Sequence, residues 1–231
     1  GGAAVGALSA ILLGASGIWL SNAAFAGALL SILLVFGIAN KFGRWSVTRL
    51  LLTGVVVSAG WGAVINILLT TSSTNNVQSM LFWLMGDLSQ SRVGIGHLLL
   101  LFTGLVGGLL ASRPLNVLIR GELLASSLGV SVKPLRLILF LSASVFTATA
   151  VTVAGSVGFV GLVIPHMLRL LGARDHRILI PSSILLGGSF LVIADSLART
   201  IVAPQQLPVG VVTAVIGVPA FILILRSTIR K

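Results

Sequence analysis

The chain has 231 residues, with 15 Lys and Arg, 4 Asp and Glu and 3 His, so its formal net charge is +11. Only 8% of the residues are charged, 56% are hydrophobic and the mean hydropathy is +1.13, whereas soluble domains carry about 25% charged residues. This composition nearly excludes a soluble enzyme, and it excludes a disordered chain. It also excludes a charge-rich nucleic-acid binder, because the basic excess reflects missing acids. The class that remains is a polytopic membrane protein.

Apolar segments recur along the whole chain and are about as long as membrane-spanning helices. A helix needs about 20 apolar residues to cross the hydrocarbon core, and these runs lack the in/out alternation of membrane β-barrel strands. We therefore predict an all-α, polytopic transmembrane bundle, in which the short sixth segment follows the fifth as a tight helical hairpin. The eight predicted spans are residues 1–20, 22–40, 50–70, 93–112, 134–154, 156–172, 179–198 and 208–226.

The third span carries a stripe of small and polar residues. Gly54, Ser58, Gly62 and Asn66 recur every four residues, a spacing that places them along one helix face. Because polar groups are costly against lipid, this face is expected to meet protein or water. It is either a packing face with one asparagine hydrogen bond or the lining of a translocation path.

The sixth span contains Pro165 and His166, and Arg169 follows one turn later. A single histidine beside an arginine is more typical of a structural hydrogen bond than of a proton relay, although a membrane-embedded enzyme that uses His166 is an alternative. The three histidines lack the spacing of metal ligands, and cysteine is absent. We therefore predict no metal site and no cofactor.

Asp195 is the one acidic residue inside a predicted span, near the end of the seventh. Arg199 follows four residues later, so the two side chains can pair on one helix face. Either the two residues form a mutually neutralised pair at a helix end, or Arg199 is a surface cation that binds an acidic partner outside. Since an acid within the membrane is a functional candidate by default, a secondary transporter or channel that uses Asp195 is the alternative function.

The Lys and Arg residues are distributed unevenly between the two sides of the membrane. Cytoplasmic loops are enriched in these residues, so the side with thirteen of the fifteen is assigned to the cytoplasm, and Arg92 and Arg199 lie outside. Both ends of the chain then face the cytoplasm. The thirteen cations are Lys41, Arg44, Arg49, Arg113, Arg120, Lys133, Arg136, Arg169, Arg174, Arg177, Arg226, Arg230 and Lys231.

Four blocks of the sequence form a characteristic series in the C-terminal half. They are GELLASSLGVSV (121–132), GSVGFVGLVIPHMLRLLGARDHR (155–177), PSSILLGGSFLVIADSLART (181–200) and LPVGVVTAVIGVPAFILIL (207–225). In this order and spacing they resemble the FecCD-like permease family of type II ABC importers, which take up iron(III)-siderophores, haem and cobalamin. FWLMGDLS (82–89) is similar to that family's external connection between two helices.

The resemblance implies the type II ABC importer permease fold with ten transmembrane helices, of which eight are expected here. Counted back from the last helix, residues 1–20 match the third helix of the family, and the chain begins without Met. We therefore expect an N-terminally truncated permease domain over residues 1–231. A cytoplasmic coupling loop is expected within it, at residues 113–134.

The resemblance also implies roles for individual residues. The coupling loop would dock in a groove of an ATPase subunit, the start of the third span matches the family's cytoplasmic gate, and the stripe matches the central path. Arg199 matches an arginine that the family presents to a glutamate of the binding protein. The implied sites are Gly121, Glu122, Ala125, Leu128 and Gly129 for coupling (with Gly121, Ala125 and Gly129 as a small face for close approach), Val47 and Thr48 for the gate, Gly54, Ser58, Gly62 and Asn66 for the path, and Pro165, His166, Arg169 and Asp195 as a structural motif.

The sequence thus predicts the permease subunit of an ABC importer for an iron(III)-chelate, haem or cobalamin, in the inner (cytoplasmic) membrane of a prokaryote. The chain has no Gly-Lys pair and hence no P-loop of its own, so ATP hydrolysis is assigned to a separate ATPase subunit. The other expected partners are a periplasmic or lipoprotein substrate-binding protein, a second permease copy in a homodimer and membrane lipid, but not nucleic acid.

Overall fold

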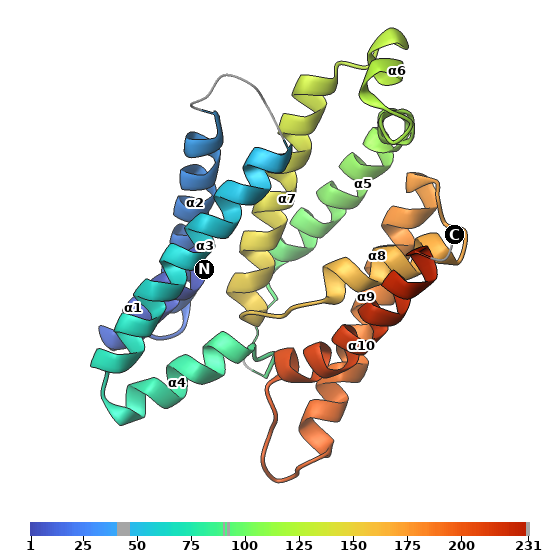
Figure 1. Ribbon diagram of the computed structural model, residues 1–231. Helices are drawn as coiled ribbons and strands as arrows, with labels where there is room; N and C mark the ends of the chain where they lie inside the picture. The colour runs from blue at the N-terminus through green and yellow to red at the C-terminus, as the bar shows by residue number, and fades with distance from the viewer. Residues whose placement is uncertain (41–46, 90, 92, 230–231) are drawn as a thin grey trace. The chain divides into compact units, whose positions relative to one another are not determined.

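The computed structural model describes residues 1–40, 47–89, 91 and 93–229, and within these ranges it is helical with no strand. The predicted all-α fold is therefore confirmed (Figure 1). The helices are α1 (Gly2–Leu12), α2 (Ile18–Asn40), α3 (Val47–Thr71), α4 (Thr74–Met85), α5 (Ile95–Leu118), α6 (Glu122–Ser127), α7 (Val132–Ala154), α8 (Val160–Leu170), α9 (His176–Thr200) and α10 (Val209–Ile229).

Five of these helices, α2, α3, α5, α7 and α9, are long and apolar enough to cross a membrane. The predicted spans 1–20 and 156–172 are wrong as full crossings, because α1 and α8 have 11 residues each. At 1.5 Å per residue such a helix is about 16 Å long, roughly half of the hydrocarbon core. Apolar composition predicted where these segments lie, but it did not reveal where each helix ends.

The predicted span 1–20 is interrupted by a glycine turn after α1. Gly14 has a positive φ of 73°, a conformation that glycine adopts without steric cost. The amide of Gly14 donates to the carbonyl of Ile11 and the amide of Ala15 to that of Ala10, which is the Schellman pattern that ends a helix. As a result α2 begins at Ile18, inside the segment that had been assigned to the first span.

Helix α4 was not predicted. Its sequence, TNNVQSMLFWLM, is only 12 residues long and has five polar residues, so a search for membrane-length apolar runs does not find it. Met80 is fully buried, and the backbone around Trp83 and Gly86 lies against the end of α7. A Cβ atom on Gly155 would stand 2.6 Å from the Trp83 carbonyl oxygen, so this contact requires glycine.

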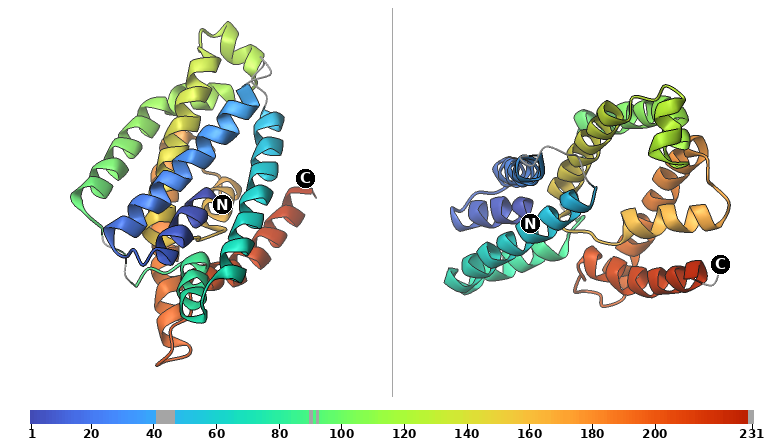
Figure 2. Two further views of the ribbon diagram at one scale, coloured as in Figure 1. Left: turned by 90° about the vertical axis from the view of Figure 1, so that its left-hand side faces the viewer. Right: turned by 45° about the horizontal axis from the view of Figure 1, so that its top comes forward.

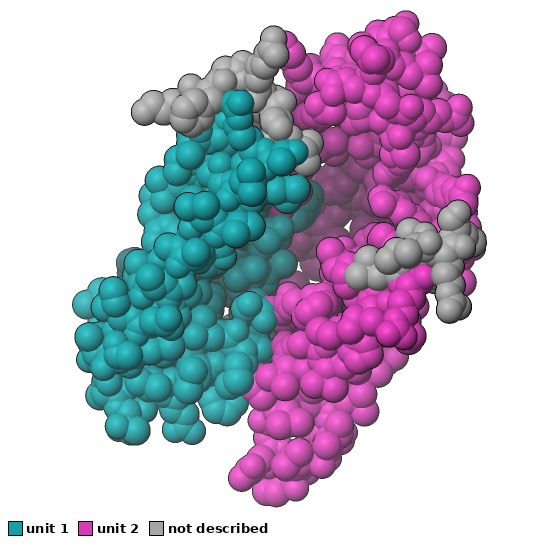
Figure 3. All heavy atoms as spheres, viewed as in Figure 1, with its two compact units in different colours: residues 1–91, 144–156 teal, residues 92–143, 157–231 magenta. Residues whose placement is uncertain are grey.

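The chain divides into two compact units, which Figure 3 colours separately. Unit 1 comprises residues 1–91 and 144–156, and unit 2 comprises residues 92–143 and 157–231. Helix α7 contributes its first half to unit 2 and its second half to unit 1.

In unit 1, α1 and α2 cross with their backbones in direct contact. A Cβ atom on Gly6 would lie 2.1 Å from the Ala23 carbonyl oxygen, and one on Gly27 would lie 2.2 Å from that of Gly2. Only glycine allows this approach, which is the usual way for helices to pack in a bilayer. Helix α3 joins the pair through the indole of Trp61, which donates a 2.9 Å hydrogen bond to Ser31 Oγ.

In unit 2, α8, α9 and α10 pack on one another, as Figure 1 and Figure 2 show, and α5 packs against α9. Phe159 begins α8 with a positive φ of 67°, which is rare for a bulky residue. A Cβ atom on Gly217 would stand 2.5 Å from the Phe159 Cβ. The small residue in α10 therefore makes room for the unusual start of α8.

Candidate functional site

The predicted coupling loop is a short helix between two membrane-length helices. Helix α5 continues through Pro114 to Leu118, and α6 follows after a turn at Gly121 with a φ of 124°. A second turn at Gly129, with a φ of 82°, leads into α7. Figure 1 shows α6 beyond the adjoining ends of α5 and α7. Residues 113–118 of the predicted coupling loop still belong to α5 and residues 132–134 belong to α7, and the coupling role of 113–134 stays a prediction.

The outer surface of α6 consists of leucine side chains. Leu123 is 87% exposed, Leu128 is 64% exposed and Leu124 is 44% exposed, whereas Ala125 is 0% exposed. Gly121 and Gly129 flank the helix and lie outside it. Of the predicted small face, Gly121 and Gly129 are exposed and Ala125 is buried within unit 2, and the docking role of the three residues stays a prediction.

Glu122 ties α6 to α7. One of its carboxylate oxygens lies 2.8 Å from a guanidinium nitrogen of Arg136, and the two side chains are 54% and 28% exposed. A partly exposed pair of this kind adds little stability. Its effect is to fix the direction of α6 with respect to α7.

A group of polar side chains joins the end of α5 to the start of α9. The Asn116 amide nitrogen donates to Asp175 Oδ1 at 2.7 Å, and the Asn116 oxygen accepts from the backbone N–H of His176 at 3.0 Å and lies 2.7 Å from His176 Nδ1. We call these three residues the α5–α9 clasp. The sequence analysis missed the clasp, because it considered Arg174 and Arg177 only as cytoplasmic cations.

Asp175 also caps α9. Its Oδ1 accepts from the backbone N–H of Arg177 at 2.9 Å, which satisfies one of the free amides at a helix start. This hydrogen bond, followed by that from Asn116, lowers the pKa of Asp175 below its ordinary value. The N-cap was detectable from sequence, since an aspartate precedes a long apolar run, but its partner Asn116 lies 59 residues away.

The predicted structural motif around His166 lies where α8 meets α10. The His166 ring meets Phe221 edge-on, with ring centroids 6.4 Å apart and an interplanar angle of 76°. Pro165 lies inside α8, and Arg169 is in its last turn. The aromatic contact favours a packing role for His166 over a proton relay, which stays a prediction.

The stripe on α3 is open within its own unit. No atom of unit 1 lies within 4 Å of a Cβ atom placed on Gly54 or Gly62, and Ser58 and Asn66 are exposed. Trp61, which bonds to α2, lies only about 60° around the helix axis from Ser58, so the side of α3 that meets α2 borders the stripe. Both interpretations of the stripe, a packing face with one asparagine hydrogen bond and the lining of the path, stay predictions.

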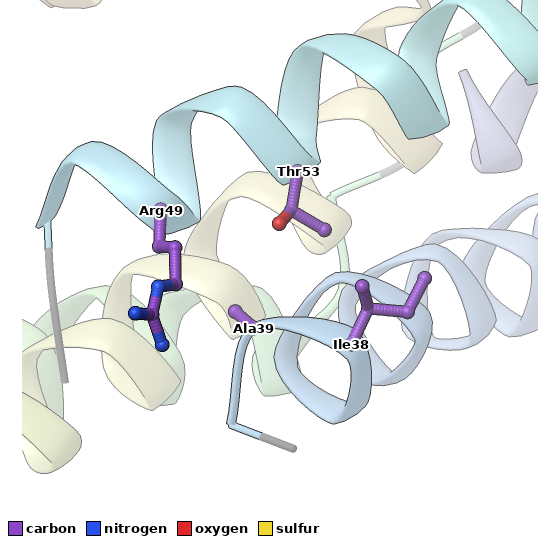
Figure 4. Close-up of a pocket in the computed structure, with 4 residues that line it drawn as sticks. All are labelled: Ile38, Ala39, Arg49 and Thr53. Atoms are coloured by element: carbon purple, nitrogen blue, oxygen red, sulfur yellow. The ribbon is translucent and has the colours of Figure 1, made fainter. Parts of the chain in front are cut away.

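A shallow cavity of about 320 Å³ lies between the end of α2 and the start of α3. Figure 4 shows Arg49 and Thr53 extending from α3 toward Ile38 and Ala39 of α2, which complete the lining. Of the predicted gate residues, Thr48 is exposed in the first turn of α3. Val47 begins that helix, but its side chain lies outside the described residues, as do Lys41 and Arg44.

The predicted pair at the end of α9 is present. Arg199 Nε donates to Asp195 Oδ2 at 2.7 Å, and the side chains are 44% and 21% exposed. Within the described chain, Asp195 Oδ1 is buried without a hydrogen-bond partner. The Arg199 side chain is thus paired with Asp195 within α9 and is still partly exposed, and its docking role stays a prediction.

The predicted site residues are divided between the two units. The gate and path residues belong to unit 1, whereas the coupling residues, the His166 motif and Arg199 belong to unit 2. Among the described residues no group of three or more His, Asp or Glu side chains could hold a metal ion. The arrangement is that of separate surfaces on membrane helices.

Comparison with known proteins identifies relatives over nearly the whole chain. A model of the FecCD transport family matches residues 1–227. The chain is 44% identical over 229 residues to the cobalamin import system permease protein BtuC of Halobacterium salinarum, covering 98% of this chain and 61% of that protein. It is 39% identical over 208 residues to the hemin transport system permease protein HmuU of Yersinia pestis, covering 88% and 62% respectively.

Two further comparisons agree. The vitamin B12 import system permease protein BtuC of Escherichia coli O127:H6 is 38% identical over 237 residues, covering 99% of this chain and 71% of that protein. A solved structure of a metal-chelate type ABC transporter in an inward-facing conformation is similar with a TM-score of 0.86 and 31% identity, covering 98% of this chain and 73% of that one. The chain spans 61–65% of the length of the first three curated relatives that it matches.

Proposed function

This chain belongs to the FecCD transport family, and from this premise we propose that it acts as the membrane-spanning permease subunit of an ATP-binding-cassette importer. It is a multi-pass membrane protein with five helices of membrane-spanning length and composition, in the prokaryotic cytoplasmic membrane that the sequence predicted. In this role it moves a substrate through the membrane, while a separate ATPase subunit hydrolyses ATP.

The observation that carries the proposal is the leucine surface of α6. A short helix at the end of α5 and α7 exposes Leu123 and Leu128, although a helix outside the bilayer gains nothing by leaving leucine in water. An apolar groove on a partner would cover these side chains. In an importer of this family that partner is the ATPase, which is consistent with a coupling role for residues 113–134.

The substrate class we propose is an iron(III)-chelate, haem or cobalamin. The relatives support the class without selecting one member, since their names specify cobalamin in one case and hemin in another. The described residues of the α3 stripe are small or uncharged. Such a lining suits a bulky substrate that the permease passes on, whereas a binding protein selects it.

The remaining partners follow from the same proposal. A substrate-binding protein docks at the outer end of α9, where the exposed edge of Arg199 can meet a carboxylate. A second copy of the permease forms a homodimer with α3 near the two-fold axis, so that both stripes line one path between the Val47 and Thr48 gates. Lipid covers the outward apolar faces.

Reconstitution tests this function. The permease would be incorporated into vesicles with its ATPase and its binding protein, and uptake of radiolabelled cobalamin, haem and an iron(III)-siderophore would be measured with and without ATP. We expect ATP-dependent uptake of one of the three. Uptake of none, by a complex in which the ATPase is bound and active, would contradict the proposed substrate class.

A further inference from the structure

Asn116 holds the end of α5 to the first turn of α9 through three contacts. Its amide nitrogen meets Asp175 Oδ1 at 2.7 Å. Its oxygen meets the backbone nitrogen of His176 at 3.0 Å and the ring Nδ1 at 2.7 Å. One side chain therefore binds both the cap of α9 and the first residue of the helix.

The chemistry of the partners fixes the orientation of this amide. An ionised carboxylate only accepts hydrogen bonds, so the atom of Asn116 facing Asp175 is the nitrogen, and the atom facing His176 is the oxygen. An amide oxygen only accepts, so His176 Nδ1 carries a proton and donates. In each of the three contacts of the α5–α9 clasp a donor then faces an acceptor. The clasp is therefore a specific contact and not an accidental approach of two helix ends.

The clasp lies next to the coupling loop. Asn116 is in the last turn of α5, and α6 begins at Glu122. On its other side α6 is held to α7 by the 2.8 Å pair of Glu122 and Arg136. A displacement of α6 that moves the end of α5 would therefore reach α9 through Asn116, while the pair of Glu122 and Arg136 connects α6 to α7.

We propose that Asn116 is a positioning residue for coupling, which transmits the movement that the ATPase imposes on α6 to helix α9. This inference rests on the proposed function. Helix α9 runs for 25 residues from the clasp to Arg199 near its other end, a length of about 37 Å. The clasp thus connects the coupling loop to the helix that carries the docking arginine.

A charge-swap series tests the clasp. Asn116→Asp replaces the donated hydrogen bond with two carboxylates in contact, whereas the double variant Asn116→Asp with Asp175→Asn restores one amide and one carboxylate. Asn116→Ser is a milder second variant. The matched controls are Asn75→Asp and Asn75→Ala, since Asn75 is an exposed asparagine in α4, outside the clasp.

The measurement is ATP hydrolysis by the reconstituted complex with and without its substrate-binding protein, which needs no identified substrate. We expect Asn116→Asp and Asn116→Ser to retain ATPase assembly and basal hydrolysis but to lose about fivefold or more of the stimulation by the binding protein. The double variant should recover most of it, and the Asn75 variants should behave as wild type.

The stimulation ratio does not depend on how much complex assembles, so a partly unstable variant still gives an answer. Unchanged stimulation in Asn116→Ser, or no recovery in the double variant, would overturn the role of Asn116. A wild-type complex that binds no ATPase would overturn the proposed function itself, and with it this inference. The two failures are thus distinguishable.

Discussion

Leu123 and Ala125 lie on opposite sides of α6: the leucine is 87% exposed and the alanine 0% exposed. Residues two apart on a helix are separated by about 200°, so the outward position of one places the other inside. Under the proposed coupling role, the leucines of α6 are therefore expected to contact the partner, whereas Ala125 packs inside unit 2.

Replacing Leu123 by Ser should weaken association with the ATPase. Burial of a leucine side chain contributes about 1.5–3 kcal/mol, so we expect at least about tenfold lower affinity. The measurement is co-purification and titration of the ATPase against the permease. Leu13→Ser is the matched control, because Leu13 is equally exposed at 87% but lies in the turn after α1. Equal affinity in both variants would remove Leu123 from the interface.

Replacing Ala125 by Leu should act on stability. The residue is fully buried, and overpacking of a filled site costs about 1–3 kcal/mol. We expect a lower midpoint of thermal unfolding in detergent for the isolated permease, before any ATPase is added. An unchanged midpoint combined with lost ATPase binding would show instead that Ala125 contacts the partner.

Arg199→Glu should slow docking of the binding protein. An exposed cation accelerates association with an acidic surface, and this effect is screened within about 10 Å at 0.1 M salt. The expected loss in association rate is therefore larger at low salt than at high salt. Surface plasmon resonance at two salt concentrations measures it, and identical rates for variant and wild type at low salt would exclude the docking role.

Single cysteines can test the stripe on α3, since the chain contains no cysteine. Ser58→Cys should react with a water-soluble thiol reagent in the assembled transporter, because its face is predicted to line the path. Val56→Cys is the control: Val56 is 71% exposed but lies on the opposite face, which is expected to meet lipid. Faster labelling at position 56 than at 58 would reverse the assignment of the two faces.

Asp175 gives a pH dependence with a defined sign. Hydrogen bonds from the Arg177 backbone and from Asn116 lower the pKa of Asp175 in the folded chain below its ordinary value. A group with a depressed folded pKa stabilises the fold above its unfolded pKa and loses that contribution as pH falls through the folded value. We expect Asp175→Asn to show a smaller loss of stability than wild type between pH 4 and pH 2. Parallel acid-unfolding curves would contradict this.

The sequence was sufficient for the long helices but not for their ends. Apolar length located α3, α5, α7 and α9, because burial in lipid requires only composition. It failed at α1, where a hydrogen-bonded turn at Gly14 interrupts an apolar run, and at α4, where five of the 12 residues are polar. Apolar length indicates whether a segment prefers lipid or water, but it does not indicate where a glycine turn ends a helix.

In the candidate sites, too, local spacing predicted some contacts and not others. The Asp195 and Arg199 pair was predictable because both residues share one helix and a four-residue spacing. The exposure of Leu123 and the burial of Ala125 depend on how α6 rests on its neighbours. The contact of Asn116 with Asp175 joins residues 59 positions apart, which no local pattern encodes.

The most direct test of the permease assignment is uptake by reconstituted vesicles in which the membrane potential and all ion gradients are collapsed while ATP is kept on the ATPase side. We predict that substrate delivered by the binding protein is still taken up and that uptake stops when ATP is removed. Uptake that disappears with the gradients and persists without ATP would contradict the assignment and would favour a secondary transporter acting through Asp195.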